Sequence, residues 1–476
     1  MRTSLLRTWC WLALMGILFV PVRAAENSPS SLPATGTFKV HEWGTFTTLQ
    51  DDEGRELPGI NIDDEPVPLF VHNLAPYLLN NPILSSDHWM YRQKGAPRQH
   101  PMVTMRLETP VLYFHPAADG TLPKTVDVNV EFRGGWLTEF YPYAQAELPG
   151  LRDNQFQFGP LTPQTRGTLS WKDVRLDTNE AGPETDAHVW LAPRKVKAVD
   201  VSVMNPGKDQ QPFLEHERYL FYRGVANRAA PLRVSTNGER DALTIRANFQ
   251  DVGGKTDCQI RAAWLVDIRS DGQTAFRTLP AMTVTSDAER IVATTPRQFS
   301  EGDYASKNLG QLQEEIQRAL VADGLHADEA AAMLATWQRA YFKTSGLRLF
   351  FTVPRVWTDH CLPLKVSGAP LTERVMVGRI ELITDQQREL LAKVGIGDSN
   401  PKWLTEVPDG PAKDKFLAGR SDFGDLGVKI PANYQAYLEL GRFRNALVIA
   451  EVKRRPSDGL ERFVTNYDIR PYKWAK

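Results

Sequence analysis

The feature that most constrains the fold is a long succession of short segments in which apolar and polar side chains alternate. In residues 126–132, Val and Phe alternate with Asp, Asn and Glu, which is the two-residue period of a half-buried β-strand. Similar segments follow one another from Thr37 to about Thr295, with Gly, Asn and Pro between them. Regularly spaced short strands of this kind predict a sandwich or one large antiparallel sheet.

One pair of these segments predicts a β-hairpin. Residues 109–132 contain two strand-like runs, and the turn-forming dipeptide Asp119-Gly120 lies between them. Because Asp-Gly favours tight turns between antiparallel strands, we expect the two runs to pair with each other.

Near Ser306 the spacing between apolar residues changes from two positions to three or four. Leu309, Leu312, Ile316 and Leu320 recur at helical spacing, and Gly324 interrupts the pattern before a second apolar stripe that contains Met333 and Trp337. These residues predict a helical hairpin of two antiparallel helices.

The last part of the chain mixes strand and helix signals. Residues 347–353 and 374–383 predict strands, and Thr384 begins a helix with Gln387 as its capping-box partner and Gly395 beyond its end. The aliphatic run 446–452 favours a buried strand, with a helix as the open alternative, and residues 462–469 predict a strand.

The expected fold class is therefore α+β, mainly antiparallel β, with a helical hairpin insertion and a C-terminal mixed α/β part. The expected divisions are 1–24 as a signal peptide, 25–36 as a flexible leader, 37–300 as a β-rich domain, 301–345 as the helical hairpin, and 346–476 as the C-terminal part, which could complete the same sheet.

The N-terminus predicts export. Arg2 and Arg7 precede an uninterrupted apolar run from Trp9 to Val20, and Val22-Arg23-Ala24 has small residues at the two positions that a signal peptidase reads, which indicates cleavage after Ala24. The run is shorter than the roughly 20 residues that span a bilayer, although an uncleaved anchor is the alternative. We therefore expect a periplasmic or secreted protein without a transmembrane segment in the mature chain.

The charge balance excludes one class of partner. Cleavage after Ala24 removes three of the 56 Lys and Arg residues and none of the 57 Asp and Glu residues, so the net charge moves from −1 to −4. A chain without a basic excess is not expected to bind nucleic acid. Cys258 and Cys361 remain after cleavage, and outside the cytosol they could form a disulfide or stay as separate thiols. The oligomeric state and any cofactor stay open.

The segment "KVHEWGTFT" at residues 39–47 holds the first candidate site residues, His41 and Glu42. Neighbouring side chains on a strand project to opposite faces, so these two cannot reach one metal ion without a bulge. A glycine inside a strand marks a bulge or the close approach of another group, and Gly44 predicts one of these here. His41 and Glu42 are either site residues beside a groove or buried residues with structural partners.

Further charged residues lie in apolar runs and pose the same question. The acids are Glu108, Glu139 and Glu381, and the arginines are Arg223, Arg348, Arg355 and Arg379. Buried charges are usually paired, so Glu–Arg pairs explain them without catalysis. The functional alternative makes Glu42, Glu108 and Glu139 acid and base in a hydrolytic cleft, with His41 in support and Trp43, Trp136 and Tyr141 as ligand-binding aromatics.

No metal site is predicted from local spacing. The nine histidines form no HxH, HExxH or HxxxH pattern. The acidic clusters 51–53 and 63–65 could bind calcium, but they lack the spacing of a calcium loop, and solvated turns are the simpler interpretation.

Several motifs together resemble a known family. They occur in the order "VHEWGTFT" (40–47), "MRLETPVLYF" (105–114), "GGWLTEFYP" (134–142), "YLFYRGV" (219–225), "GLRLFFTVPR" (346–355), "LPLKV" (362–366) and "VGRIEL" (377–382). In this combination the chain resembles a family of exported proteins of environmental bacteria with an HEWGTFT-type opening. The resemblance covers residues 38–384 and implies export and a shared fold, and it carries over no activity and no catalytic residue.

Three hypotheses follow from the sequence. The first is an exported hydrolase with a carboxylate-lined cleft, for which Glu42→Gln abolishes turnover and leaves the melting temperature unchanged. The second is a non-catalytic envelope or ligand-binding protein for a small molecule or polymer, for which the same substitution mainly lowers stability. The third, a metal-dependent protein, ranks below both.

Overall fold

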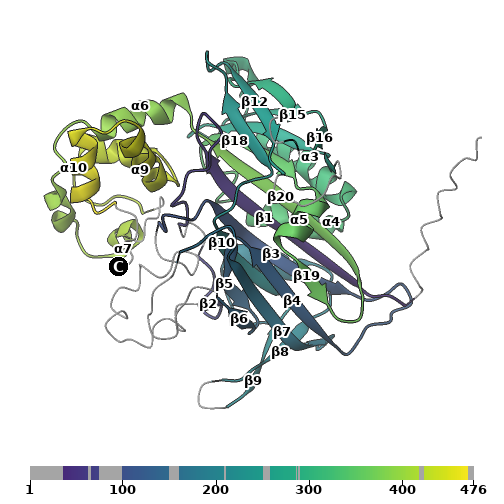
Figure 1. Ribbon diagram of the computed structural model, residues 1–476. Helices are drawn as coiled ribbons and strands as arrows, with labels where there is room; N and C mark the ends of the chain where they lie inside the picture. The colour runs from purple at the N-terminus through teal and green to yellow at the C-terminus, as the bar shows by residue number, and fades with distance from the viewer. Residues whose placement is uncertain are drawn as a thin grey trace, which may run out of the picture. The chain divides into compact units, whose positions relative to one another are not determined.

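The computed structural model describes residues 36–62, 66–73, 99–148, 160–207, 211–249, 258–285, 287, 290–417 and 423–469. The expected signal peptide, the leader up to residue 35 and the acidic cluster 63–65 lie outside these residues. The described residues all belong to one compact unit, Thr35–Lys476 (Figure 1).

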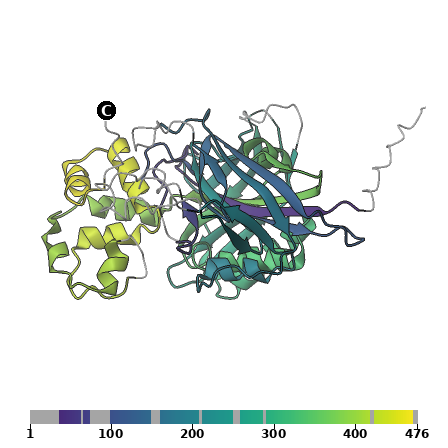
Figure 2. The same cartoon turned by 90° about the horizontal axis from the view of Figure 1, so that it is seen from below.

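A 15-stranded sheet forms the centre of this unit, in the order β15-β14-β18-β20-β1-β3-β10-β5-β7-β4-β19, with β2, β6, β8 and β9 attached beside this path. Most neighbours are antiparallel, whereas β1 and β20 are parallel. Figure 2 shows the strong twist of the sheet, as expected for right-handed strand twist. The strands are β1 (Lys39–Gln50), β2 (His72–Asn73), β3 (Met105–His115), β4 (Thr125–Arg133), β5 (Gly135–Tyr141), β6 (Gln145–Glu147), β7 (Arg166–Leu176), β8 (Val201–Asn205), β9 (Phe213–Glu217), β10 (Leu220–Ala226), β14 (Ala263–Ile268), β15 (Thr274–Leu279), β18 (Gly346–Thr352), β19 (Leu364–Val366) and β20 (Leu371–Leu382).

Two small sheets and a set of helices complete the described fold. The small sheets pair β11 (Leu232–Thr236) with β12 (Ala242–Ala247) and β17 (Ile291–Pro296), and β13 (Cys258–Ile260) with β16 (Met282–Val284). The helices are α2 (His188–Leu191), η1 (Pro193–Lys195), η3 (Glu301–Asp303), α3 (Asn308–Ala322), α4 (Ala327–Thr336), α5 (Arg355–Cys361), α6 (Asp385–Val394), η4 (Pro401–Glu406), α7 (Pro411–Leu417), α8 (Ala432–Glu439), α9 (Arg444–Arg454) and α10 (Asp458–Asn466). The α+β class predicted from the sequence is confirmed. Within the described residues, none of the helices combines the length and the apolar character that crossing a membrane requires.

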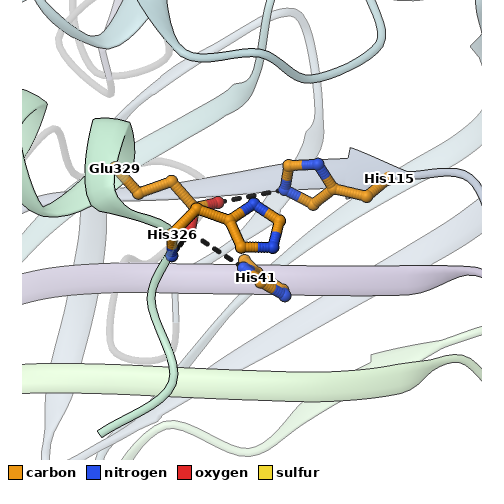
Figure 3. A group of neighbouring side chains, drawn as sticks. All are labelled: His41, His115, His326 and Glu329. Atoms are coloured by element: carbon orange, nitrogen blue, oxygen red, sulfur yellow. Dashed lines mark hydrogen bonds and ion pairs between the residues drawn. The ribbon is translucent and has the colours of Figure 1, made fainter. Parts of the chain in front are cut away.

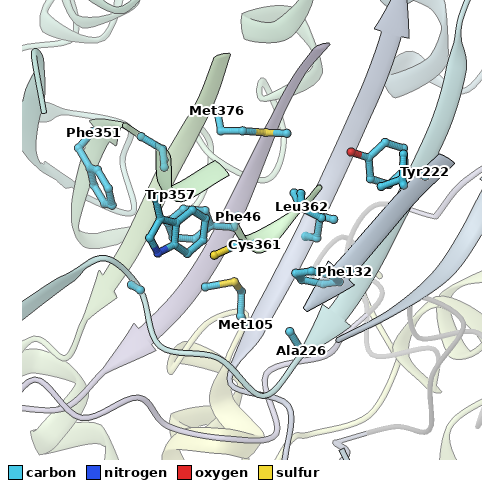
Figure 4. Close-up of a cluster of buried hydrophobic side chains, with 14 of the residues drawn as sticks. Phe46, Met105, Phe132, Tyr222, Ala226, Phe351, Trp357, Cys361, Leu362 and Met376 are labelled. Carbon is cyan, nitrogen blue, oxygen red and sulfur yellow. The ribbon is translucent and has the colours of Figure 1, made fainter. Parts of the chain in front are cut away.

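The large sheet buries side chains on both faces. On β1, Val40 and Phe46 join one core cluster, and Trp43, on the opposite face, joins another. The first cluster also contains Met105, Phe351 and Trp357 (Figure 4). Because β1 lies between β20 and β3 and is covered on both sides, every residue after Lys39 is buried. Such a central strand fixes the direction of each of its side chains.

The predicted helical hairpin is confirmed. Helices α3 and α4 carry the apolar stripes, and Leu312, Ile316, Leu320 and Met333 are buried in the cluster that contains Trp43. The hairpin therefore packs against the His41 face of the sheet, since His41 and Trp43 project to the same side of β1.

The C-terminal part is partly as predicted. Strands β18 and β20 do complete the large sheet, and α6 begins at the Thr384–Gln387 capping box. The strands predicted at residues 446–452 and 462–469 are wrong. Residues 446–452 lie in α9, and residues 462–466 lie in α10. The Ser457 side chain accepts a hydrogen bond from the Leu460 amide at the start of α10, a local helix signal that outweighs the β-branched composition.

The predicted hairpin in residues 109–132 is also wrong. Strand β3 pairs with β1 and β10, whereas β4 pairs with β7 and β19. Both edges of β3 are already occupied by more distant segments, so the Asp-Gly turn connects strands that are separated within the sheet.

Candidate metal centre

Strand β1 positions His41 on the face covered by the helical hairpin. The register of β1 against β3 shifts between Trp43 and Thr45, so the predicted irregularity beside Gly44 is present. A Cβ atom at Gly44 would lie 2.9 Å from the Pro110 Cα and 3.0 Å from the Met376 Sδ. The backbone of β3 thus approaches where only glycine fits, and the predicted close approach is confirmed as well.

Strand β3 ends at His115, close to His41. In the antiparallel register His41 lies opposite Tyr113, and His115 lies two residues further along β3. Residues at such diagonal positions share a face and are within reach of each other's long side chains. The two imidazole ring centroids are 4.7 Å apart.

Helix α4 supplies the other two residues at its first turn. His326 is the N-cap residue and Glu329 is the third residue of the helix, so the two lie three positions apart on one face. The Glu329 carboxylate accepts a hydrogen bond from the His326 backbone N–H at 2.7 Å, the reciprocal contact of a capping box. This contact helps to orient the carboxylate toward His41 on β1 and His115 on β3.

The four side chains converge on one point (Figure 3). His41 Nδ1 lies 2.8 Å from Glu329 Oε2, and His115 Nε2 lies 3.0 Å from Glu329 Oε1. The His326 ring centroid is 4.5 Å from that of His41 and 4.7 Å from that of His115. One ligand atom from each residue can be chosen so that all four lie within 4.8 Å of one another.

The charges of the group suit a cation. Burial by itself raises the pKa of a carboxyl group, but hydrogen bonds with His115 and His41 outweigh it and lower the pKa of Glu329 to about 2. Burial, together with the neighbouring His41 and His115, lowers the pKa of His326 below its usual range. The cluster therefore offers an ionised carboxylate and a neutral imidazole, the forms in which these side chains bind metal ions.

The donor set fits a divalent transition metal. Imidazole nitrogens bind zinc, copper, iron and nickel, and zinc accepts a carboxylate as a further ligand. Tetrahedral zinc with bonds of about 2.0–2.1 Å requires ligand atoms roughly 3.3 Å apart. The two histidine nitrogens lie 2.8 and 3.0 Å from the Glu329 oxygens, and all four ligand atoms lie within 4.8 Å of one another, so the group is compact enough for one ion once the side chains adjust around it.

The three carboxylates predicted for a hydrolytic cleft lie apart from this centre. Glu42, Glu108 and Glu139 are 0%, 2% and 4% exposed, and each is paired with arginine. Glu42 contacts Arg374 at 2.5 Å and accepts a hydrogen bond from Tyr222, Glu108 contacts Arg106 at 3.3 Å, and Glu139 pairs with Arg223. The shared, solvent-reachable concavity that the acid/base hypothesis requires is not the arrangement observed, because unpaired buried carboxylates are too costly in an apolar sheet.

The aromatic residues predicted to contact a ligand lie in the cores. Trp43 packs near Tyr113, Trp136 near His100, and Tyr141 near Phe70. All three predicted residues are buried, so they form no exposed aromatic row. Contacts with these neighbouring rings account for the three aromatic residues without a ligand.

Two further expectations concern local groups. Asp51 and Asp52 of the acidic cluster 51–53 form ion pairs with Arg55 and Arg388, so arginine side chains balance the charge of these two carboxylates. Cys258 and Cys361 are both described and do not form a disulfide.

Sequence reasoning identified His41 but missed His115, His326 and Glu329 as its partners. The one local signal was the His326-x-x-Glu329 spacing at the start of a predicted helix, which places two ligands on the same helical face. His41 and His115 are far from this pair in the chain, and only the sheet register and the packing of the hairpin bring them to it.

Comparisons with known proteins name no function. No protein-family model and no curated protein matches the chain. Among solved structures it is similar to the Fcho1 Mu homology domain of Danio rerio with a bound Eps15 peptide, at 8% identity over 73% of this chain and 97% of that domain, with a TM-score of 0.26. A likeness this distant carries no argument.

Proposed function

We propose that the protein is an exported metalloprotein that binds one divalent transition-metal ion, with zinc as the first candidate. The single observation that carries the proposal is the triangle of His41, His115 and His326, with ring centroids 4.5–4.7 Å apart around the Glu329 carboxylate.

An ion-pair cluster without metal explains this arrangement less well. One carboxylate balances only one imidazolium, and a second protonated ring at centroid separations of 4.5–4.7 Å would be repelled by the first. Glu329 also accepts the His326 backbone N–H, which uses part of its hydrogen-bonding capacity. A metal ion at the centre removes the repulsion, because it binds the neutral rings and is balanced by the carboxylate.

The compartment belongs to the same proposal. The N-terminal signal pattern and the HEWGTFT-type motifs support export to the periplasm or beyond the cell, where we expect the mature chain to bind its ion from the surroundings. The near-neutral net charge supports a partner other than nucleic acid.

Metal analysis of the full-length chain, purified from its exported fraction, tests the proposal. We expect about one equivalent of zinc or another first-row ion by mass spectrometry after dialysis, and a marked loss in His41→Ala and Glu329→Gln. His216→Ala is the matched control, since His216 on β9 hydrogen-bonds Ser202 and lies outside the cluster. Wild-type protein that takes up no ion after dialysis against micromolar zinc contradicts the proposal.

A further inference from the structure

The four candidate ligands come from parts of the chain that are far apart in sequence. His41 lies on β1 and His115 on β3, whereas His326 and Glu329 lie at the first turn of α4 (Figure 3). The contacts of Glu329 with His41 and His115 span 288 and 214 positions of the sequence. An ion bound by all four side chains therefore connects the helical hairpin to two strands of the large sheet.

The ligand set is complete without a further group. Zinc in structural sites is almost always tetrahedral with four protein ligands, whereas catalytic zinc keeps one position open. Three imidazoles and one carboxylate supply four ligand atoms, so they fill a tetrahedral ion. His41, His115 and Glu329 are buried and His326 is exposed, so His326 is the ligand between the ion and solvent. This arrangement is that of a structural metal site.

Polar contacts outside the centre hold this end of the hairpin only weakly. The apolar stripes of α3 and α4 pack into the core cluster that contains Trp43. At the turn between the two helices, the polar contacts include the Arg261–Asp323 ion pair at 3.0 Å and the hydrogen bond that the Lys197 backbone N–H donates to Asp328 at 2.9 Å. Both contacts are exposed, and exposed polar pairs contribute little to stability. A buried ion with four ligands is a stronger link than either.

We propose that the ion is structural and holds the helical hairpin against the sheet, an inference that rests on the metal binding proposed above. Moving α4 away from β1 and β3 separates His326 and Glu329 from His41 and His115, so this movement must release the ion. The free energy of opening therefore rises with the concentration of the free metal ion. In an exported chain, metal in the surroundings then controls whether the hairpin stays docked.

Hydrogen exchange of the full-length chain, followed by mass spectrometry with zinc and with EDTA, tests the inference. At a free zinc concentration of 100 times the dissociation constant, the slow amides of α4 should exchange about 100-fold more slowly, because openings that break the site must release the ion. Helix α9, which packs in a different core cluster, is the internal control. Its amides should change by less than about threefold, because local openings of α9 leave the site intact.

Two variants at the same turn separate the effect of the metal from the packing of the hairpin. His326→Ala removes a ligand from the hairpin, so the same zinc concentration should slow exchange in α4 by less than about threefold. Asp323→Asn changes a residue outside the centre and should keep the full effect. The comparison of wild type with and without zinc stands even where a variant folds poorly. An equal slowing in α4 and α9, or no slowing in α4 of a chain that carries zinc, overturns the inference.

A spectroscopic measurement tests whether the ligand set is complete. Azide added to the cobalt-loaded chain should leave the visible absorption unchanged, because four protein ligands leave no position for it. A changed spectrum shows an open position and overturns the structural assignment. Failure of the metal proposal is recognised separately, because the chain then carries no zinc by mass spectrometry before exchange begins.

Discussion

The two faces of β1 hold two buried acids in opposite settings. On one face Glu42 meets the Arg374 guanidinium and the Tyr222 hydroxyl, and its charge is balanced within the protein. On the other face Glu329 contacts the rings of His41 and His115 and the backbone N–H of His326. An acid paired with arginine is complete without a ligand, whereas an acid surrounded by three imidazoles forms the donor set of a metal site. The adjacent residues His41 and Glu42 thus serve different purposes.

The largest expected effect is on the Glu42 side of this comparison. Glu42→Gln removes the buried carboxylate partner of Arg374 and leaves it only the partly exposed Asp359, so we expect the free energy of unfolding to fall by about 3 kcal/mol, the lower end of the range for a broken buried ion pair. Urea denaturation of wild type and variant, both stripped of metal, measures it. A free energy of unfolding equal to that of wild type would contradict the structural role and would support Glu42 as a site residue.

The second effect concerns the Glu329 side and depends on metal. Zinc at a free concentration of 100 times its dissociation constant should stabilise the wild-type chain by about 2.7 kcal/mol, because the ion binds only the folded state. Thermal unfolding with and without EDTA measures this. The same addition should leave Glu329→Gln nearly unaffected, and equal stabilisation of both proteins would place the ion elsewhere.

A smaller effect on stability is expected at acidic pH. The pKa of Glu329 is lowered to about 2 from an ordinary value of 4.5, so its ionised form stabilises the fold above pH 4.5. This contribution should be lost as the pH falls from 4.5 toward 2. Metal-free Glu329→Gln should show a flatter decline of stability over this range, as measured by urea denaturation at each pH. Parallel curves for the two proteins would argue against a charged Glu329.

The smallest effect is expected for an exposed ion pair, which sharpens the contrast with buried ones. Glu301 pairs with Arg269 at 2.6 Å on the surface, and Glu301→Gln should leave the denaturation midpoint nearly unchanged because solvent screens the pair. Chemical denaturation checks this. A loss as large as that of Glu42→Gln would show that burial is not what distinguishes the two acids.

Local patterns predicted much of the fold, and long-range pairing explains the rest. The alternation in residues 126–132 and the stripe through Leu312 and Ile316 depend on a few neighbouring residues, and both elements are present as predicted. The partner of each strand depends on distant segments, and so the hairpin expected in residues 109–132 is absent. The run 446–452 was ambiguous because a short apolar run has no distinctive period.

In the candidate site too, the local pattern was predictable from the sequence and the long-range contacts were not. The His326-x-x-Glu329 spacing is visible in the sequence, and His41 stood out as a histidine in an apolar strand. Their meeting with His115 requires the β1–β3 register, the irregularity near Gly44 and the docking of α4. None of these can be inferred from spacing, because the contact between His41 and Glu329 spans 288 positions.

X-ray absorption at the zinc edge of the loaded full-length chain tests the central claim most directly. We expect a first shell dominated by imidazole nitrogen, with three such ligands and at least one oxygen at about 2.0–2.1 Å. The imidazole contribution should fall in His115→Ala and stay unchanged in His216→Ala. A shell made only of oxygen, or one that does not change in His115→Ala, would contradict binding at the three histidines and Glu329.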